Sequence, residues 1–451
     1  MARLITFSRC RASTPGSWNV YIARSATGRT ESSHFNRLFL DESMALKLLL
    51  VSVTGTVVNL HNKVDHQIAK QLGALAAELH GHGVKVALWS NEKWTCNGMP
   101  LAKYVEQFSG VPIYAHGVGW DGSPARHKGD SAAGILKTHD VKRFETLFLG
   151  GGEGDMIAGV NNRLLHIRSD WYGQTSDHGF QVQSVEELRR FCILFGLRKH
   201  NLFWHVQHGN LDAATAGPFS TIKEAYAHFG YDAREAAKFG AGHPDFWFYI
   251  TIASLYFSGM MEDVDYICSF PGHKAGHKNP SAGSMEAILA RMGRCTRSSY
   301  YHDLVIRHSD ALKSQPIKSD DRLFSTQINS IRLNKYPHRN LAGEARKSAI
   351  SLKGKRVLVV DDMVTSGRSL ECARAFIEAA GGTARLFGWL KTINTAYREI
   401  SPALSGLKPF APNTIAAEPK SVGHSYHDSI VGPGAPTELD GIFKRFCSWP
   451  N

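Results

Sequence analysis

Two adjacent carboxylates, Asp361 and Asp362, follow the apolar run Val357–Val360. Neighbouring carboxylates repel each other, and burying them without a partner costs free energy. A short turn comes next, followed by an amphipathic segment that predicts a helix from about Leu370. The turn has the sequence Thr365-Ser366-Gly367-Arg368-Ser369. We therefore expect a ligand outside the strand to account for the acid pair.

The order of strand, acids, turn and helix favours a phosphorylated sugar as that ligand. In a parallel sheet, ligands bind beyond the carboxyl ends of the strands. Aspartates at that edge can accept hydrogen bonds from sugar hydroxyls or approach Mg²⁺. The backbone N–H groups and hydroxyls of the turn would hold an anion at the positive end of the helix dipole. Together these features describe a ribose 5-phosphate.

Three other kinds of motif share parts of this pattern. A P-loop is excluded because no Gly-Lys-[Ser/Thr] sequence ends the turn. A receiver domain of the response-regulator kind also carries "VLVVDD", but at its start, and a later strand of it ends in Asp. In this chain no strand after the pair ends in Asp. A purely structural strand, turn and helix stays open.

The motif resembles the phosphoribosyl diphosphate motif of the type I phosphoribosyltransferases: an apolar strand, two acids, two residues, then Thr-[Thr/Ser]-Gly. The resemblance implies that Asp361 and Asp362 face the ribose hydroxyls and Mg²⁺, and that the turn residues Thr365 to Ser369 hold the 5-phosphate. Arg368 departs from the small residue that often follows the glycine. Replacement of pyrophosphate by a nitrogenous acceptor is the implied reaction.

The resemblance extends upstream to "VDYICSFPGHKAGHKN", a strand followed by a Gly/His/Lys loop. The corresponding loop of the family holds the pyrophosphate, which makes candidates of Ser269, Gly272, His273 and Lys274. The polar segment Ser314–Gly343 occupies the position of the mobile loop that closes over the site. These features are most similar to the competence-associated, amidophosphoribosyltransferase-like branch.

The ligand also indicates what the site must do. Breaking the bond from C1 to pyrophosphate makes an oxocarbenium-like centre and a highly charged leaving group. Mg²⁺, Lys274 and loop arginines would stabilise that charge, and closure of the loop would exclude water. Either both acids only position the sugar, or Asp362 also takes a proton from the nucleophile. Trp389 and Lys391 lie where an acceptor base could stack or be hydrogen-bonded, although a tryptophan on a strand is more often buried in the core.

Another α/β pattern occupies the N-terminal half and resembles the haloacid-dehalogenase (HAD) superfamily. Its nucleophile motif, a strand ending Asp-x-Asp-Gly-Thr, is replaced by Ser52-Val53-Thr54-Gly55-Thr56, so both carboxylates are missing. Ser90 matches the second motif and Lys128 the third. The expected Gly-Asp of the last motif is replaced by Gly150-Gly151, although Asp155 remains. A serine cannot replace the aspartate nucleophile without an activating base. We expect a retained fold without catalysis.

These patterns predict an α/β protein with two parallel-sheet domains, one HAD-like and one of the type I phosphoribosyltransferase fold, joined by a helical segment. The expected parts are an unstructured N-terminal extension (1–43), the degenerate HAD-like domain (44–197), a helical linker (198–259), the phosphoribosyltransferase domain (260–400) and a C-terminal tail (401–451).

Composition sets the wider limits. The 451 residues carry a formal net charge of +12, which suits phosphates or nucleic acid but also a weakly basic surface. Seven scattered cysteines without a Cys-x-x-Cys pair argue for the reducing cytoplasm. The longest apolar run, Phe246–Met261, is too short to span a bilayer and predicts a buried helix. The sequence identifies neither the acceptor nor the oligomeric state, with a homodimer as one option.

Two rival functions remain. A non-catalytic sensor of phosphoribosyl diphosphate that binds nucleic acid or a partner protein is compatible with the net charge, although no helix-turn-helix or basic-aromatic RNA motif is present. An active phosphatase ranks last because of the missing carboxylates.

Overall fold

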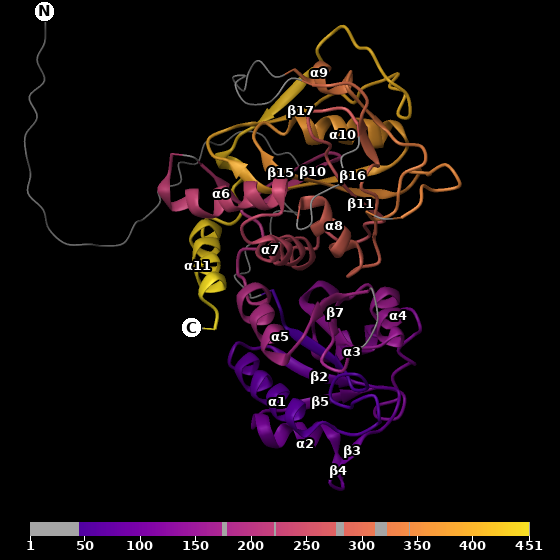
Figure 1. Ribbon diagram of the computed structural model, residues 1–451, viewed down its shortest axis with the longest axis vertical. Coiled ribbons are helices and arrows are strands. Elements are labelled where there is room, and N and C mark those ends of the chain that lie inside the picture. Colours follow the sequence, from indigo (N-terminus) through magenta and orange to yellow (C-terminus); the bar gives the residue numbers. More distant parts are fainter. Residues whose placement is uncertain are drawn as a thin grey trace, which may run out of the picture. The chain divides into compact units, whose positions relative to one another are not determined.

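The computed structural model describes residues 45–173, 178–220, 222–276, 284–311, 323–341 and 343–450. The expected N-terminal extension, residues 1–43, lies outside the described residues. Two six-stranded sheets organise the described chain, as the prediction of two parallel-sheet α/β domains requires (Figure 1). All described residues belong to one compact unit.

The sheet of the N-terminal domain is parallel throughout, with the strand order β5-β2-β1-β6-β7-β8. Its strands are β1 (Leu48–Ser52), β2 (Lys85–Trp89), β5 (Ile113–His116), β6 (Thr146–Gly150), β7 (Leu165–Ser169) and β8 (Phe180–Val182). Its connections contain α1 (His66–Gly81), the hairpin β3 (Thr95–Cys96) and β4 (Met99–Pro100), α2 (Leu101–Ser109), α3 (Ala133–His139), α4 (Glu153–Asn162) and α5 (Val185–Phe191). Strand β1 is buried along its whole length, as an apolar strand in the middle of a parallel sheet must be.

Helix α1 shows why the alternation of elements could be predicted here. The Asp65 side chain accepts hydrogen bonds from the backbone N–H groups of Gln67 and Ile68 and so caps the helix. Its buried positions recur at helical spacing and face the core. They are Ala69, Leu72, Gly73, Leu75, Ala76 and Leu79.

The second sheet has the order β12-β11-β15-β16-β10-β9, and β9 alone of these strands runs antiparallel to its neighbour. Its strands are β9 (Trp204–His208), β10 (Leu211–Phe219), β11 (Tyr266–Ser269), β12 (Ser299–Tyr300), β15 (Arg356–Val364) and β16 (Thr383–Thr392). The helices of this half are α6 (Glu224–Phe239), α7 (Pro244–Phe257), α8 (Met285–Gly293), α9 (Phe324–Ile328), α10 (Arg368–Ala379) and α11 (Ala435–Ser448). Two small antiparallel sheets of two strands each complete this half. One pairs β13 (Val305–Arg307) with β14 (Ile331–Leu333), and the other is the hairpin of β17 (Tyr397–Ile400) and β18 (Ser421–His424).

The predicted helical linker 198–259 is wrong in its first part. Strands β9 and β10 occupy residues 204–219 and extend the second sheet, where β10 pairs in parallel with β16. Strand β10 is nearly all buried, but four of its nine residues are alanine or glycine and one is proline. Thr215 and Phe219 are its only β-branched and aromatic residues, so the signal by which strands are recognised is weak. Only α6 and α7 of this stretch are helical.

Helix α7 is the predicted buried helix, and eleven of its fourteen residues are buried. The Trp247 ring stacks on the Trp389 ring of β16, with ring centres 5.3 Å apart and planes inclined by 14°. Both side chains are fully buried. In the described residues, no helix combines the length and the apolar character needed to cross a membrane.

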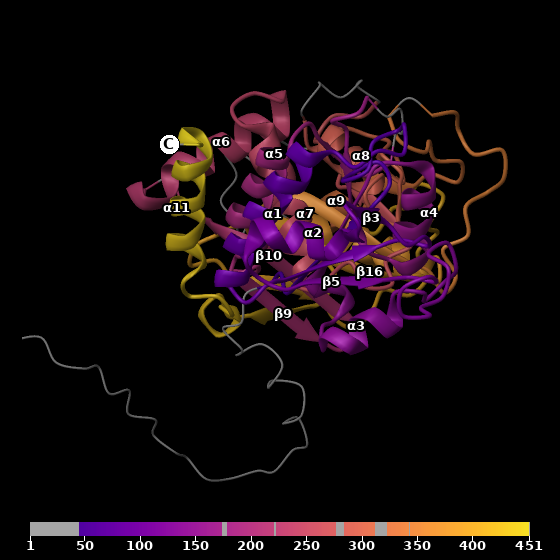
Figure 2. The ribbon, with the colours of Figure 1, turned by 90° about the horizontal axis from the view of Figure 1, so that it is seen from below.

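The C-terminal residues are not a loose tail throughout. Helix α11 lies beside α6 in both views (Figures 1 and 2). Its buried side chains Leu439, Ile442 and Phe446 belong to the same apolar cluster as α7. The last helix is thus part of the core.

The Trp247–Trp389 stack supports a first prediction. Trp389→Ala removes a fully buried indole and leaves a cavity, so we expect the free energy of unfolding to fall by about 3–5 kcal/mol. Ile222→Ala, at a side chain that is 92% exposed, should change it by less than about 0.5 kcal/mol. Urea titrations of both variants check this, and equal losses would contradict the packing described.

Candidate functional site

The acid pair lies inside β15 rather than after its end. The parallel ladder with β16 continues through Asp361, opposite Gly388, to Val364, opposite Lys391. Both carboxylates are half-buried, and each accepts a hydrogen bond from the backbone N–H of the next residue, at 2.9 Å and 2.8 Å. The strand was predicted to end at Val360, but it continues for four more residues, to Val364. The prediction ended it early because paired carboxylates are unfavourable in most strands.

The electrostatics of the pair leave room for a cation. Burial, and next the neighbouring Asp362 carboxylate, raise the pKa of Asp361 well above its usual range. Within the described ranges, no lysine, arginine or histidine forms an ion pair with either side chain. Carboxylate oxygens are the ligands that Mg²⁺ prefers, so Asp361 and Asp362 fit the role of holding it.

The turn after β15 offers unpaired backbone donors. Helix α10 begins at Arg368, and Gly367 before it is left-handed, with φ of 74°. Among the described residues, the backbone N–H groups of Ser366, Gly367 and Ser369 have no acceptor. Such a helix start binds anions. We call Thr365–Ser369 the phosphate turn.

Contacts on one side of the phosphate turn aim these donors toward the other side. The Thr365 carbonyl accepts from Lys391 Nζ at 2.6 Å and from Thr395 Oγ1 at 3.0 Å, and the Ser366 carbonyl accepts from the Arg398 N–H at 2.9 Å. In a trans peptide the next N–H points opposite to the carbonyl. The N–H groups of Ser366 and Gly367 therefore point away from β16 and β17.

Glycine is required at position 367 for two reasons. Its positive φ disfavours L side chains, and a Cβ there would lie 1.9 Å from the Tyr397 ring. The Arg368 guanidinium, the departure from the family pattern, lies 5.6 Å from the centre of the Phe324 ring. The large side chain thus packs on a neighbouring element.

The structure places Trp389 and Lys391 in the interior, which for Trp389 is the alternative to contact with an acceptor base. Trp389 is buried against Trp247, and Lys391 is fully buried beneath the phosphate turn. Besides the Thr365 carbonyl, Lys391 Nζ bonds Thr395 Oγ1 at 2.6 Å and the Thr395 carbonyl at 2.7 Å. Lys391 therefore positions the phosphate turn. A lysine within an otherwise apolar strand was the sequence signal that it is buried and hydrogen-bonded.

The second predicted loop starts at the same sheet edge. Ser269 ends β11 opposite Val360, one residue before the acid pair, and Ser269 is buried. Gly272 and Lys274 are exposed and His273 is half-buried. The structure thus brings the loop's first residues next to β15. Residues 277–280 of the same loop lie outside the described residues.

Arg307 is a residue of this region that sequence reasoning missed. Its guanidinium donates to the Gly272 carbonyl, to Gln327 Oε1 at 2.9 Å and to Ser330 Oγ at 2.5 Å. Burial lowers its pKa to about 10. Arg307 connects the Gly272 loop to the segment that was expected to close over the site.

That segment, Ser314–Gly343, is partly a folded element. Residues 314–322 and 342 lie outside the described residues. In the rest, Glu418 caps α9 by accepting from the N–H groups of Phe324 and Ser325, and β14 pairs with β13. The described part therefore contains a capped helix and a paired strand.

In the N-terminal domain, an arginine connects the positions that correspond to two of the expected motifs. Arg126 Nη1 donates to Ser52 Oγ at 2.7 Å and to Asp155 Oδ1 at 2.8 Å. The other oxygen of Asp155 accepts from the N–H groups of Gly151 and Gly152. Both carboxylate oxygens are therefore occupied. Lys128, the residue predicted for this role, is exposed.

Lys391 supports a prediction about pH. Burial lowers its pKa to about 7, below the unfolded value of about 10.4. Between these values the unfolded chain binds more protons, so this lysine's contribution to the free energy of unfolding rises with pH. Relative to Lys391→Met, the wild type should gain up to about 1.4 kcal/mol per pH unit between about pH 7 and 9 in urea titrations.

Lys353→Met is the matched control, because Lys353 is exposed on the same domain. Its difference from the wild type should not change over this pH range. A Lys391→Met difference that stays constant or shrinks with rising pH would contradict a buried, titrating amine beneath the phosphate turn.

Solved structures with similarity to this chain include several HAD-superfamily proteins. A protein assigned as a phosphoglycolate phosphatase from Lactobacillus delbrueckii subsp. bulgaricus is 23% identical (TM-score 0.21), over 27% of this chain and 51% of that one. The deoxy-D-mannose-octulosonate 8-phosphate phosphatase of Haemophilus influenzae is 14% identical (TM-score 0.21; 29% and 68%). A HAD-superfamily hydrolase from Geobacter sulfurreducens is 9% identical (TM-score 0.22; 32% and 95%). The chain spans about half the length of the first of these.

The C-terminal domain matches a family by sequence. The model of the phosphoribosyl transferase domain matches residues 296–387. No curated protein matches the sequence. The acid pair, the phosphate turn and α10 all lie within the matched residues. The chain therefore contains a phosphoribosyl transferase domain.

Proposed function

We propose that the C-terminal domain is a phosphoribosyltransferase that takes phosphoribosyl diphosphate and exchanges its pyrophosphate for a nitrogenous acceptor, or runs this reaction in reverse. The observation that carries the proposal is the pairing of two carboxylates with a turn whose N–H groups are unpaired among the described residues. A ribose 5-phosphate has hydroxyls for the first and a phosphate for the second.

The acidic residues and the N–H groups of the phosphate turn bind different parts of the ligand. Asp361 and Asp362 accept hydrogen bonds from the ribose hydroxyls and hold Mg²⁺, which neutralises phosphate charge when bound. The phosphate turn holds the 5-phosphate through the N–H groups of Ser366, Gly367 and Ser369. Because the turn is already formed, binding costs little reorganisation.

The pyrophosphate belongs at the neighbouring loop. Ser269 and the exposed Gly272 follow β11, the strand next to β15, and the exposed Lys274 supplies positive charge for the leaving group. Arg307 holds the Gly272 carbonyl, which fixes the peptide that follows. A charged leaving group is thus met by a loop that begins beside β15 and carries an exposed lysine.

The N-terminal domain, in this proposal, has no phosphatase activity. A HAD-type nucleophile is a carboxylate, and this chain has Ser52 and Thr54 in its place. The Arg126 guanidinium supplies a fixed positive charge between Ser52 and Asp155. This guanidinium forms an ion pair with the Asp155 carboxylate, which would otherwise attract a metal ion. We also place the protein in the cytoplasm, since its described cysteines are unpaired.

The acid pair gives the test of the transferase. The double variant Asp361→Asn/Asp362→Asn should lose more than about 100-fold in pyrophosphate release over a panel of nitrogenous acceptors. Its melting temperature should not fall, because neutral amides remove the repulsion that raises the pKa of Asp361. Asp428→Asn, at an exposed aspartate, is the control and should keep full activity.

Unchanged turnover in the double variant would remove both acids from the mechanism. Tight, salt-dependent nucleic-acid binding by a wild type that turns over no acceptor would favour the non-catalytic sensor instead.

A separate assay tests the N-terminal domain. Phosphate release from p-nitrophenyl phosphate and sugar phosphates, with added Mg²⁺, should stay at the uncatalysed rate for the wild type. Release that disappears in Asp155→Asn and survives in the Asp361→Asn/Asp362→Asn variant would show an active phosphatase.

A further inference from the structure

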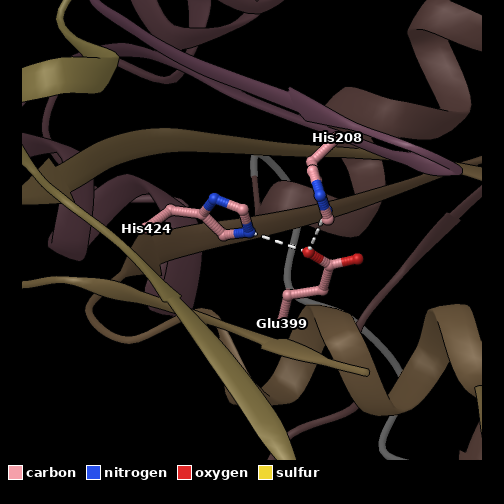
Figure 3. A group of neighbouring side chains, drawn as sticks. All are labelled: His208, Glu399 and His424. Atoms are coloured by element: carbon pink, nitrogen blue, oxygen red, sulfur yellow. Dashed lines mark hydrogen bonds and ion pairs between the residues drawn. The ribbon is translucent and has the colours of Figure 1, made fainter. Parts of the chain in front are cut away.

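Three side chains from three strands meet behind the phosphate turn. His208 ends β9, Glu399 lies in β17 and His424 ends β18 (Figure 3). His208 Nδ1 lies 2.8 Å and His424 Nε2 lies 2.7 Å from the same carboxylate oxygen, Oε2 of Glu399. We call these residues the His-Glu-His cluster. We propose that it binds a divalent transition-metal ion, Zn²⁺ above all.

The donor set is the first reason. Two imidazole nitrogens and one carboxylate oxygen are ligands that Zn²⁺ accepts, and three protein ligands leave a fourth position for water. The three ligand atoms lie within 4.8 Å of one another. In a tetrahedral site with bonds of about 2.0–2.2 Å, neighbouring ligand atoms are about 3.3–3.6 Å apart. Each imidazole nitrogen therefore needs to move away from Glu399 Oε2 by about 0.5–0.9 Å.

Exposure allows this adjustment. The His208 side chain is 58% exposed, whereas those of Glu399 and His424 are 7% and 15% exposed. One ligand can thus move while two are held, and the ion can enter from the His208 side.

Charge is the second, independent reason. Arg374 is the arginine in the ion pairs of three acids, Glu371, Glu378 and Glu399. Glu371 is satisfied by Arg374, by the Tyr397 hydroxyl at 2.8 Å and by the Ile400 N–H at 3.0 Å. Among the described residues, Glu399 Oε1 has one arginine contact, at 3.8 Å, and Glu399 Oε2 has the two imidazoles. A buried carboxylate without a permanently charged partner at hydrogen-bonding distance attracts a cation.

The position of the cluster connects it to the phosphate turn. Strand β17 also carries Tyr397, whose ring packs on Gly367, and Arg398, whose N–H holds the Ser366 carbonyl. An ion at the cluster would fasten the β17–β18 hairpin to β9, the edge strand of the sheet. If the proposed function holds, the ion also strengthens phosphate binding at the phosphate turn. The metal site at the His-Glu-His cluster does not depend on the proposed function.

The test is the binding of Zn²⁺ or Co²⁺ alone to the full chain, without any sugar phosphate. The wild type, stripped with chelator, should bind one ion with nitrogen ligands, seen as intense visible Co²⁺ absorption that Zn²⁺ displaces. His208→Ala and His424→Ala should each weaken Zn²⁺ binding by more than about tenfold. His208→Ala removes an exposed side chain and should fold normally.

His427→Ala is the matched control, an exposed histidine three residues from His424 that is outside the cluster. It should bind as the wild type does. Equal affinity in wild type, His208→Ala and His424→Ala, or no Co²⁺ absorption in the wild type, would overturn the proposal and leave a hydrogen-bonded cluster. Transferase activity without metal binding would refute this inference alone, and metal binding without transferase activity would refute only the proposed function.

Discussion

Two like-charged carboxylates lie within a few residues of three N–H groups that have no acceptor among the described residues, and the surrounding fold holds both in place. Strand β15 continues through Asp361 and Asp362 because β16 pairs with it, and Gly388, opposite Asp361, leaves room for the Val364 side chain, which a Cβ there would meet at 2.3 Å. Carbonyls of the phosphate turn are bound from behind, so its donors point outward. An anionic sugar ligand satisfies both halves of this arrangement together.

The elements behind the turn form a continuous support. Lys391 lies under the Thr365 carbonyl, Tyr397 lies against Gly367, and Glu371 of α10 accepts from the Tyr397 hydroxyl. The β17–β18 hairpin extends this support to the His-Glu-His cluster at the edge of the sheet. Buried polar networks of this kind stabilise one arrangement only when every member is satisfied. The His-Glu-His cluster is the part of this network that an added cation would stabilise most.

The sequence allowed the two sheets, the turn and α10 to be predicted because local patterns specify them: apolar strands, an acid pair, a Gly and a helical repeat. Strand β10 was missed since alanine, glycine and proline make up five of its nine residues and weaken the strand signal. Lys391, Arg307 and Arg126 were missed as positioning residues for another reason. Their partners lie up to 74 residues away in the chain, and a single sequence does not show which distant residues meet. In the N-terminal domain, Arg126 contacts Ser52 and Asp155, whereas Lys128, two positions later, is exposed.

The most direct measurement of the central claim is calorimetric titration of the wild-type chain with phosphoribosyl diphosphate, with and without Mg²⁺, alongside Gly367→Ala. The account predicts saturable binding of one ligand per chain that weakens without Mg²⁺. It also predicts that Gly367→Ala abolishes binding, because the added methyl group meets the Tyr397 ring and disturbs the turn. No heat of binding in the wild type, or equal binding in the glycine variant, would contradict it.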